Sequence, residues 1–180
     1  MADAPRIGFI CGSLREGSIN QKLSTALQTR VVASGANAIE INLGDYDLPI
    51  YHGDLAPPDD VKRLSTDMKA CDGIIVITPE YNGSLTPLLK NAIDWTSTTG
   101  TDQFTKPIYG VASCSPGPMS GIMVMRQLTY ILMRVGAHVV PTQCGTGNAA
   151  GAFDADGNLV AEPSSTMADK MVRQILARLS

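Results

Sequence analysis

Short apolar runs recur along the chain and alternate with segments in which apolar residues return every three or four positions. Residues 73–77 show the clearest run, because their apolar character is nearly continuous. A continuous run predicts a strand buried on both faces, which is typical of a parallel sheet covered by helices on both sides. The runs predict five β-strands, at residues 7–11, 38–43, 73–78, 108–113 and 137–141.

Helical periodicity appears between and after these strands. Ile19, Leu23 and Leu27 begin one apolar stripe, and Ser18 is suited to cap it. Similar stripes cover residues 122–135 and 167–179. Strands that alternate with helices predict a doubly wound α/β fold, whose ligand lies beyond the carboxyl ends of the strands. Two long segments are predicted to be loops of the kind that form binding elements, small hairpins or interfaces, at residues 44–58 and 142–163.

The length of 180 residues fits one domain spanning residues 1–180. With 44% apolar and 17% charged residues, the chain is typical of a compact soluble protein. A formal net charge of −3 provides no basic surface for nucleic acid or for a membrane, and residues 1–6 lack the apolar stretch of a signal peptide. The four cysteines form no C-x-x-C pair. We therefore expect reduced thiols, no metal site and a cytoplasmic location.

A polar loop, residues 12–20, connects the first predicted strand to the first predicted helix. Free backbone N–H groups and the helix dipole favour an anion at such a junction. Ser13, Ser18 and Asn20 add hydrogen-bonding groups, and Arg15 adds a permanent positive charge. The lysine of a P-loop is missing, and so is the second glycine of the dinucleotide fingerprint. The loop therefore predicts a site for a terminal monophosphate, such as that of FMN.

A second polar turn, residues 78–84, follows the third predicted strand. Pro79 restricts φ, while Asn82 and Gly83 tolerate the positive φ values of a tight turn. Backbone amides here are positioned to bond a flat heteroaromatic ring, and the Tyr81 ring is available to cover one face. Because both loops follow parallel strands, we expect them to lie side by side. An ordinary βα turn with a surface tyrosine is the alternative interpretation.

Together, the two motifs closely resemble the signatures of the NADPH-dependent FMN reductase family, which includes bacterial quinone, chromate and azo-dye reductases. The matching segments are Gly12-Ser13-Leu14-Arg15…Ser18…Asn20 and Pro79-Glu80-Tyr81-Asn82…Pro87…Leu89-Lys90-Asn91-Ala92-Ile93-Asp94-Trp95. The resemblance implies a flavodoxin-like three-layer sandwich whose five parallel strands have the order 2-1-3-4-5. It also implies one non-covalent FMN per subunit and a homodimer or homotetramer.

The resemblance further implies where FMN binds. The phosphate would be held by Ser13, Arg15, Ser18 and Asn20, with Ile19 beside them. The ribityl chain and the isoalloxazine would lie against Pro79, Glu80, Tyr81, Asn82 and Gly83, mainly at backbone groups. More flavin contacts are expected after the fourth strand, at Ser113, Ser115 and Gly117. Many members of the family carry paired glycines in that loop, whereas prolines flank Gly117 here.

We therefore expect an oxidoreductase without catalytic side chains of its own, because the flavin carries the chemistry. In a ping-pong cycle, NADPH or NADH passes a hydride to the flavin N5. A quinone or a similar small-molecule acceptor (flavin, azo dye or chromate) then takes its place. The alternatives are a flavodoxin-type electron carrier and a regulatory module with or without flavin. The choice between NADH and NADPH stays open, because no cluster of residues marks a 2′-phosphate site.

Several other residues are expected to have structural roles. Trp95 is predicted to pack in the core or at a subunit contact rather than against a cofactor. Ser84 is suited to cap the helix that follows it. Met123, Met125 and Met133 are expected mainly in the core, with an adaptable oligomer surface as the alternative.

Overall fold

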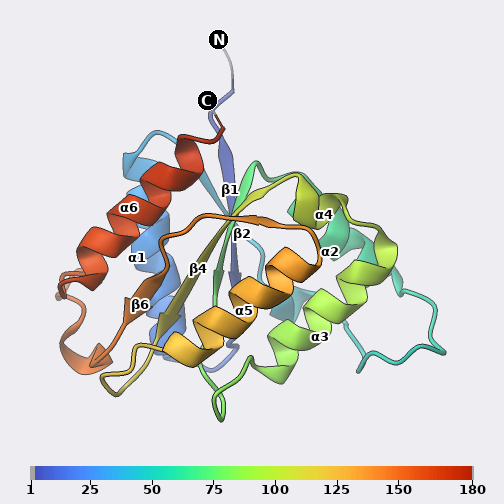
Figure 1. Ribbon diagram of the computed structural model, residues 1–180, viewed down its shortest axis with the longest axis horizontal. Coiled ribbons are helices and arrows are strands. Elements are labelled where there is room, and N and C mark those ends of the chain that lie inside the picture. The colour runs from blue at the N-terminus through green and yellow to red at the C-terminus, as the bar shows by residue number, and fades with distance from the viewer. Residues whose placement is uncertain (1–2, 180) are drawn as a thin grey trace.

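A parallel β-sheet is the middle layer of the computed structural model, which describes residues 3–179 (Figure 1). The strand order is β2-β1-β3-β4-β5, and β6 also pairs with β4. All of these pairs are parallel. The predicted order and the three-layer, flavodoxin-like architecture are thereby confirmed. The strands are β1 (Arg6–Cys11), β2 (Asn37–Glu40), β3 (Gly73–Ile77), β4 (Ile108–Cys114), β5 (His138–Val139) and β6 (Cys144–Thr146).

Helices cover both faces of the sheet and separate two hydrophobic cores. Helices α1 (Ile19–Ala33) and α6 (Ser164–Leu176) lie on one face. The other face carries α2 (Asp59–Lys69), α3 (Pro87–Thr96), α4 (Asp102–Thr105) and α5 (Ile122–Arg134). Side chains of one strand alternate between the two cores. Within β3, Ile75 and Ile77 pack with the α1 side, whereas Ile74 and Val76 pack with the opposite side. This double burial explains why β3 is apolar throughout.

Two strands differ substantially from their predicted limits, whereas the other three agree to within one residue. The edge strand expected at residues 137–141 is shortened to β5, and the segment of residues 142–163, which is predicted to be a loop, contains β6. The Val140 N–H still donates to the Tyr109 carbonyl at 2.8 Å, but Pro141 has no N–H with which to continue the ladder. The second strand ends at Glu40 rather than at residue 43. It stops because the Asn42 side chain accepts a bond from Gly44 N at 3.1 Å and begins a short 3-10 turn.

Some local predictions are corrected by the structure. The cap of α3 is Thr86, whose hydroxyl accepts a hydrogen bond from Leu89 N, and not Ser84. Met125 is buried as expected, but Met123 and Met133 are 48% and 62% exposed. The reason is that these two side chains lie on the outer face of α5, away from the sheet. The Trp95 ring is completely buried, as expected.

Helix α2 was not predicted, although its sequence carries the pattern of a helix. Val61, Leu64 and Met68 are all buried and lie at helical spacing along one face. Asp59 and Asp60 occupy the first turn, where negative charge complements the helix dipole. No element is predicted for residues 59–69, which directly follow the predicted loop of residues 44–58.

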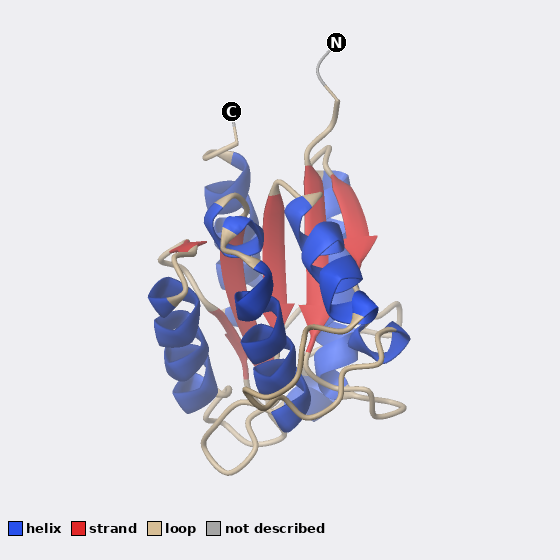
Figure 2. Cartoon of the chain, turned by 90° about the vertical axis from the view of Figure 1, so that its right-hand side faces the viewer, coloured by secondary structure: helices blue, strands red, loops and turns tan. Residues whose placement is uncertain are grey.

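The loops that follow the strands gather at one end of the sheet, opposite the two chain termini (Figure 2). The carboxyl ends of the parallel strands point to this end, so it is where a ligand site is expected. Within residues 3–179, no helix is both long and apolar enough to cross a membrane.

Candidate functional site

The loop between β1 and α1 begins with a close approach between backbone and side chains. At Gly12, a Cβ atom would lie 2.8 Å from Thr78 Oγ1 and 3.0 Å from Thr86 Oγ1, so a larger residue would displace both hydroxyls. Glycine here lets the end of β1 lie against the start of α3. Ser18 caps α1 as predicted, because its hydroxyl accepts a hydrogen bond from Asn20 N at 3.3 Å. The loop therefore delivers the N-terminus of α1 to the carboxyl edge of the sheet.

Two polar side chains of this loop are left available for a ligand. The Arg15 guanidinium reaches only the carbonyls of Glu16 and Gly17, at 3.3 and 3.4 Å, and pairs with no carboxylate among residues 3–179. Ser13 is buried, yet its hydroxyl bonds to no other group in the described part of the chain. An uncommitted guanidinium and hydroxyl beside a helix N-terminus are suited to a phosphate.

Asn20 has a different task from its neighbours. Its side-chain amide donates to the Cys114 carbonyl at 2.9 Å and accepts from Cys114 N at 2.8 Å. Asn20 is buried, and both its amide nitrogen and its amide oxygen are bonded inside the protein. The bonds join the first turn of α1 to the end of β4. They therefore hold the loop of residues 12–20 at a fixed distance from the loop after β4.

The turn after β3 is a tight hairpin attached to α5. Tyr81 and Ser84 exchange two backbone hydrogen bonds of 3.0 Å, and Asn82 and Gly83 have φ values of 53° and 78°. The predicted positive φ values are thus confirmed. The Glu80 carboxylate accepts from Val124 N, in the first turn of α5, at 3.2 Å. The Tyr81 ring remains half exposed at the mouth of the site.

These segments enclose a cleft of about 250 Å³ at the carboxyl edge of the sheet. Most residues predicted from the sequence line it, together with Cys114 and Pro116. Asn82 and Gly83 form the tip of the hairpin instead, and Gly117 lies beyond the cleft, where its carbonyl accepts a bond from the Ser115 hydroxyl. The lining residues are Ser13, Arg15, Ser18, Ile19, Asn20, Pro79, Glu80, Tyr81, Cys114, Ser115 and Pro116.

Ser113, a predicted site residue, does not line the cleft. It is completely buried, and its hydroxyl has no hydrogen-bond partner among the described residues. A Cβ built on Gly121 would lie 2.0 Å from Ser113 Oγ, so the side chain packs beneath the start of α5. The β4 pleat directs Ser113 to the opposite side from the flanking residues.

Sequence reasoning missed the function of Asn91, which follows the second loop within α3. Its amide accepts from Tyr51 N at 2.8 Å and donates to the carbonyls of Leu48 and Pro49 at 3.2 and 3.0 Å. One turn later, Trp95 Nε1 also donates to Pro49 O, and the Trp95 ring meets the Tyr51 ring edge-on at 5.0 Å. Polar and aromatic residues four positions apart on one helix are the signal that could have revealed this clamp.

The cysteines supply no reactive group to the site. All four are free thiols and buried. Burial raises the pKa of Cys11 and Cys114 to about 11, so both remain protonated at neutral pH. Among residues 3–179, no cluster of His, Cys, Asp or Glu is arranged to hold a metal ion.

The observed chemistry fits a phosphate monoester joined to a flat ring system. Ser13 and Arg15 supply free groups of the kind that bind a phosphate, and the cleft continues from them between the hairpin and the loop after β4. A parallel sheet with these two loops at its carboxyl edge defines the flavodoxin-like class of flavin-binding proteins.

Comparison with known proteins agrees with this class. The sequence profile of the NADPH-dependent FMN reductase family matches residues 5–151. A quinone reductase of Pseudomonas putida is 32% identical over 166 residues, which are 88% of this chain and 87% of that protein. An NAD(P)H-dependent FMN reductase of Pseudomonas aeruginosa is 29% identical over 180 residues, which are 97% of this chain and 95% of that protein.

A solved structure shows the same architecture. The flavoenzyme NAD(P)H:acceptor oxidoreductase FerB of Paracoccus denitrificans superposes with a TM-score of 0.79 and 29% identity, covering 97% of this chain and 98% of that one. This chain belongs to the NADPH-dependent FMN reductase family. It is an oxidoreductase that uses FMN as its cofactor and NAD(P)H as its reductant.

Proposed function

We propose that this protein is an NAD(P)H-dependent quinone reductase working by a ping-pong cycle. FMN, when bound, would supply the redox chemistry, by which a hydride from NAD(P)H and a proton from solvent reduce the quinone to a hydroquinone. The reductant and the acceptor use the same open side of the cleft in turn. Quinones are favoured as acceptors by the named relatives, and flavins, azo dyes and chromate belong to the same proposal.

The chain's own residues bind and orient the cofactor. Arg15 and Ser13 hold the phosphate, together with the free N–H groups in the first turn of α1 and Ser18 and Ile19 beside them. The backbone of Pro79, Glu80 and Tyr81 lies along the ring edge, with Asn82 and Gly83 shaping the turn. Ser115 closes the opposite side of the cleft, where Ser113 and Gly117 shape the loop from behind.

The observation that carries this proposal is the uncommitted Arg15 guanidinium beside the half-exposed Tyr81 ring, in one cleft. The guanidinium matches a phosphate, and the open ring face leaves room for a second flat molecule above the flavin. An electron carrier would need the first feature, whereas a reductase needs both.

The test is the anaerobic visible spectrum of the FMN-loaded protein before and after NADPH or NADH is added. We expect rapid two-electron bleaching that a quinone reverses. A bound flavin that stays oxidised with both nucleotides would reject the reductase and favour an electron carrier. Failure to retain FMN at micromolar concentration would favour a regulatory module.

We also propose that the protein forms a homodimer or a homotetramer in the cytoplasm. The outer face of α5 and the loop before it expose Met119, Met123, Tyr130 and Met133. Large apolar side chains grouped on one face are typical of a protein interface. Sedimentation equilibrium measures the assembly directly, and a monomer at micromolar concentration would contradict it. Four unpaired thiols are typical of a reducing compartment, and cell fractionation tests that location.

A further inference from the structure

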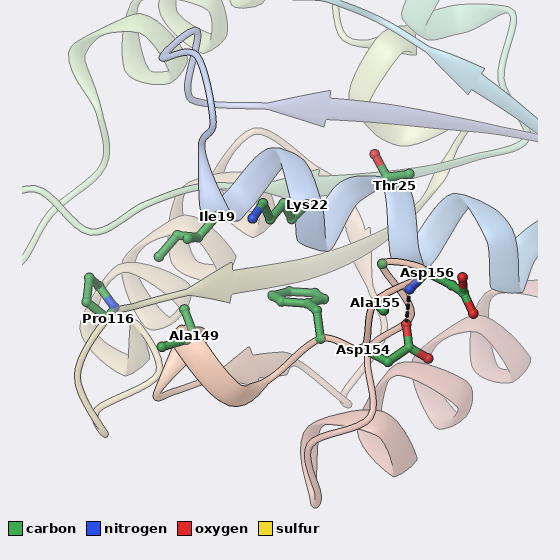
Figure 3. A pocket seen from close by; sticks show the side chains of 11 residues that line it. Ile19, Lys22, Thr25, Pro116, Ala149, Asp154, Ala155 and Asp156 are labelled. Carbon is green, nitrogen blue, oxygen red and sulfur yellow. Dashed lines mark hydrogen bonds between the residues drawn. The ribbon is translucent and has the colours of Figure 1, made fainter.

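A second and larger hollow adjoins the flavin cleft. It has a volume of about 680 Å³ and lies between α1 and the segment of residues 149–157 (Figure 3). Ile19 and Pro116 line both the hollow and the cleft, so the two spaces meet at the start of α1.

The chemistry of the groove changes along its length. At the cleft end, Lys22 projects from α1 beside Ile19, and its ammonium forms no ion pair or hydrogen bond among residues 3–179 (Figure 3). Apolar side chains also line the groove, among them Phe153 and the small side chains of Ala149 and Ala150. Phe153 packs against the core on the α1 side of the sheet, and this packing fixes its position.

The far end of the groove is acidic. The Asp154 carboxylate accepts hydrogen bonds from Asp156 N at 3.0 Å, Asn158 N at 2.8 Å and Asn158 Nδ2 at 3.0 Å. These bonds lower the pKa of Asp154, which therefore stays ionised and holds the turn in shape. The Asp156 carboxylate has no partner within the described residues, and it lines the groove. The groove is thus lined by a cation, an aromatic ring and a free hydrogen-bond acceptor.

We propose that this groove binds the adenosine diphosphate portion of NAD(P)H while the nicotinamide lies in the cleft. The inference rests on the proposed reductase function. The diphosphate matches Lys22, the adenine ring matches Phe153, and the adenosine ribose matches the free Asp156 carboxylate. A volume of this size is within the range of small-molecule sites. FMN ends at its phosphate and so does not fill the groove.

Two measurements on the FMN-loaded protein test the groove. The first is the affinity for ADP-ribose by calorimetry, which reports binding without any redox reaction. Lys22→Ala is expected to weaken it about tenfold, because one charge-assisted contact is lost at an exposed site. Lys22→Glu is expected to weaken it further, because a like charge then faces the diphosphate. Lys170→Ala is the matched control, since Lys170 is an exposed lysine on α6 that does not line the groove.

The second measurement compares two reductants. Reduced nicotinamide riboside carries the reacting ring but lacks the adenosine diphosphate portion of NADH. In Lys22→Ala, kcat/KM is expected to fall about tenfold with NADH and to stay unchanged with the truncated reductant. Phe153→Leu keeps the apolar volume but removes the ring, so it should lower kcat/KM for NADH a few-fold with the same selectivity.

The outcomes separate this inference from the function beneath it. If the wild-type flavin is not bleached by NADH, the reductase proposal itself fails. If bleaching is normal and the Lys22 and Phe153 variants bind ADP-ribose like the wild type, only the groove assignment is wrong. FAD is the other source of this ligand chemistry. A variant that binds FAD more weakly in the flavin-free protein, with unchanged constants for NADH, would also overturn the assignment.

Discussion

The two loops that form the cleft use their polar side chains in opposite ways. In the loop of residues 12–20, Arg15 and Ser13 are free of strong internal partners. In the hairpin of residues 79–84, the Glu80 carboxylate bonds to Val124 N and the Ser84 hydroxyl donates to Gln127 Oε1 at 2.8 Å. The first loop therefore has side chains available for a ligand. In the second loop, polar side chains form hydrogen bonds with α5, so that its backbone and the Tyr81 ring remain available.

This difference follows from the groups that each loop is expected to bind. A phosphate gains from a mobile cation and several donors, which must not be neutralised inside the protein. A flat ring gains from a rigid wall at a constant distance, and rigidity comes from hydrogen bonds to a neighbouring helix. Substitutions of Arg15 or Ser13 should then change FMN affinity with little effect on stability, and substitutions of Glu80 or Ser84 should do the reverse. Asn20 and the cap residue Ser18 are exceptions in the first loop, because their side chains bond inside the protein.

The largest effect is expected for Asn20→Ala. This change leaves the buried N–H and carbonyl of Cys114 without partners, which should lower the free energy of unfolding by about 2–4 kcal/mol. Urea denaturation of the FMN-free protein measures it. Asn20→Asp should lose at least as much stability, because it places a second acceptor against the Cys114 carbonyl and buries a charge. Asn37→Ala is the control, because Asn37 is exposed and reaches Ala4 O only at 3.4 Å. Wild-type stability in Asn20→Ala would mean that the Cys114 pairing is not maintained in solution.

Arg15→Ala is the next largest change, and it acts on binding alone. Loss of a charge-assisted contact to the phosphate should weaken FMN about 10- to 100-fold, with an unchanged urea midpoint. The FMN affinity of Arg15→Lys should lie between those of the wild type and Arg15→Ala, because lysine keeps the charge but lacks the planar guanidinium. Fluorescence titration gives the dissociation constants, and Arg178→Ala on the last turn of the chain is the control. An unchanged constant in Arg15→Ala would remove Arg15 from the phosphate site.

The same contrast explains which parts of the site could be predicted from sequence. The alternation of strands and helices and the positive φ values of Asn82 and Gly83 follow from local patterns, and the strand order follows from the family resemblance; all three are confirmed. The Asn20–Cys114 pairing joins residues 94 positions apart, and no local pattern encodes it. The burial of Ser113 depends on the pleat of β4 and on the absence of a side chain at Gly121. Predictions about a single side chain fail where a distant segment decides its direction.

Larger elements were missed for related reasons. Helix α2 follows two prolines, and turn residues near its start outweighed a short apolar stripe. The exposure of Met123 and Met133 was not predicted, because methionine is common both in cores and on adaptable surfaces. The groove beside α1 depends on how residues 149–157 pack against a helix more than 120 positions earlier in the chain. The side chains that line the two walls of the groove come together only in the folded protein.

The smallest effect is expected for Glu80→Ala, and it tests the other half of the comparison. Removing the carboxylate leaves Val124 N without its partner in the first turn of α5, which should lower the free energy of unfolding by about 1 kcal/mol. FMN affinity should change much less than in Arg15→Ala, because the carboxylate bonds to a helix rather than to the ligand. Glu16→Ala is the matched control, since Glu16 is an exposed acidic residue in the phosphate loop. Urea midpoints and FMN titrations on the same samples decide the matter. If Glu80→Ala weakens FMN as strongly as Arg15→Ala and leaves stability unchanged, then Glu80 contacts the flavin directly and the hairpin is a source of ligand-binding side chains after all.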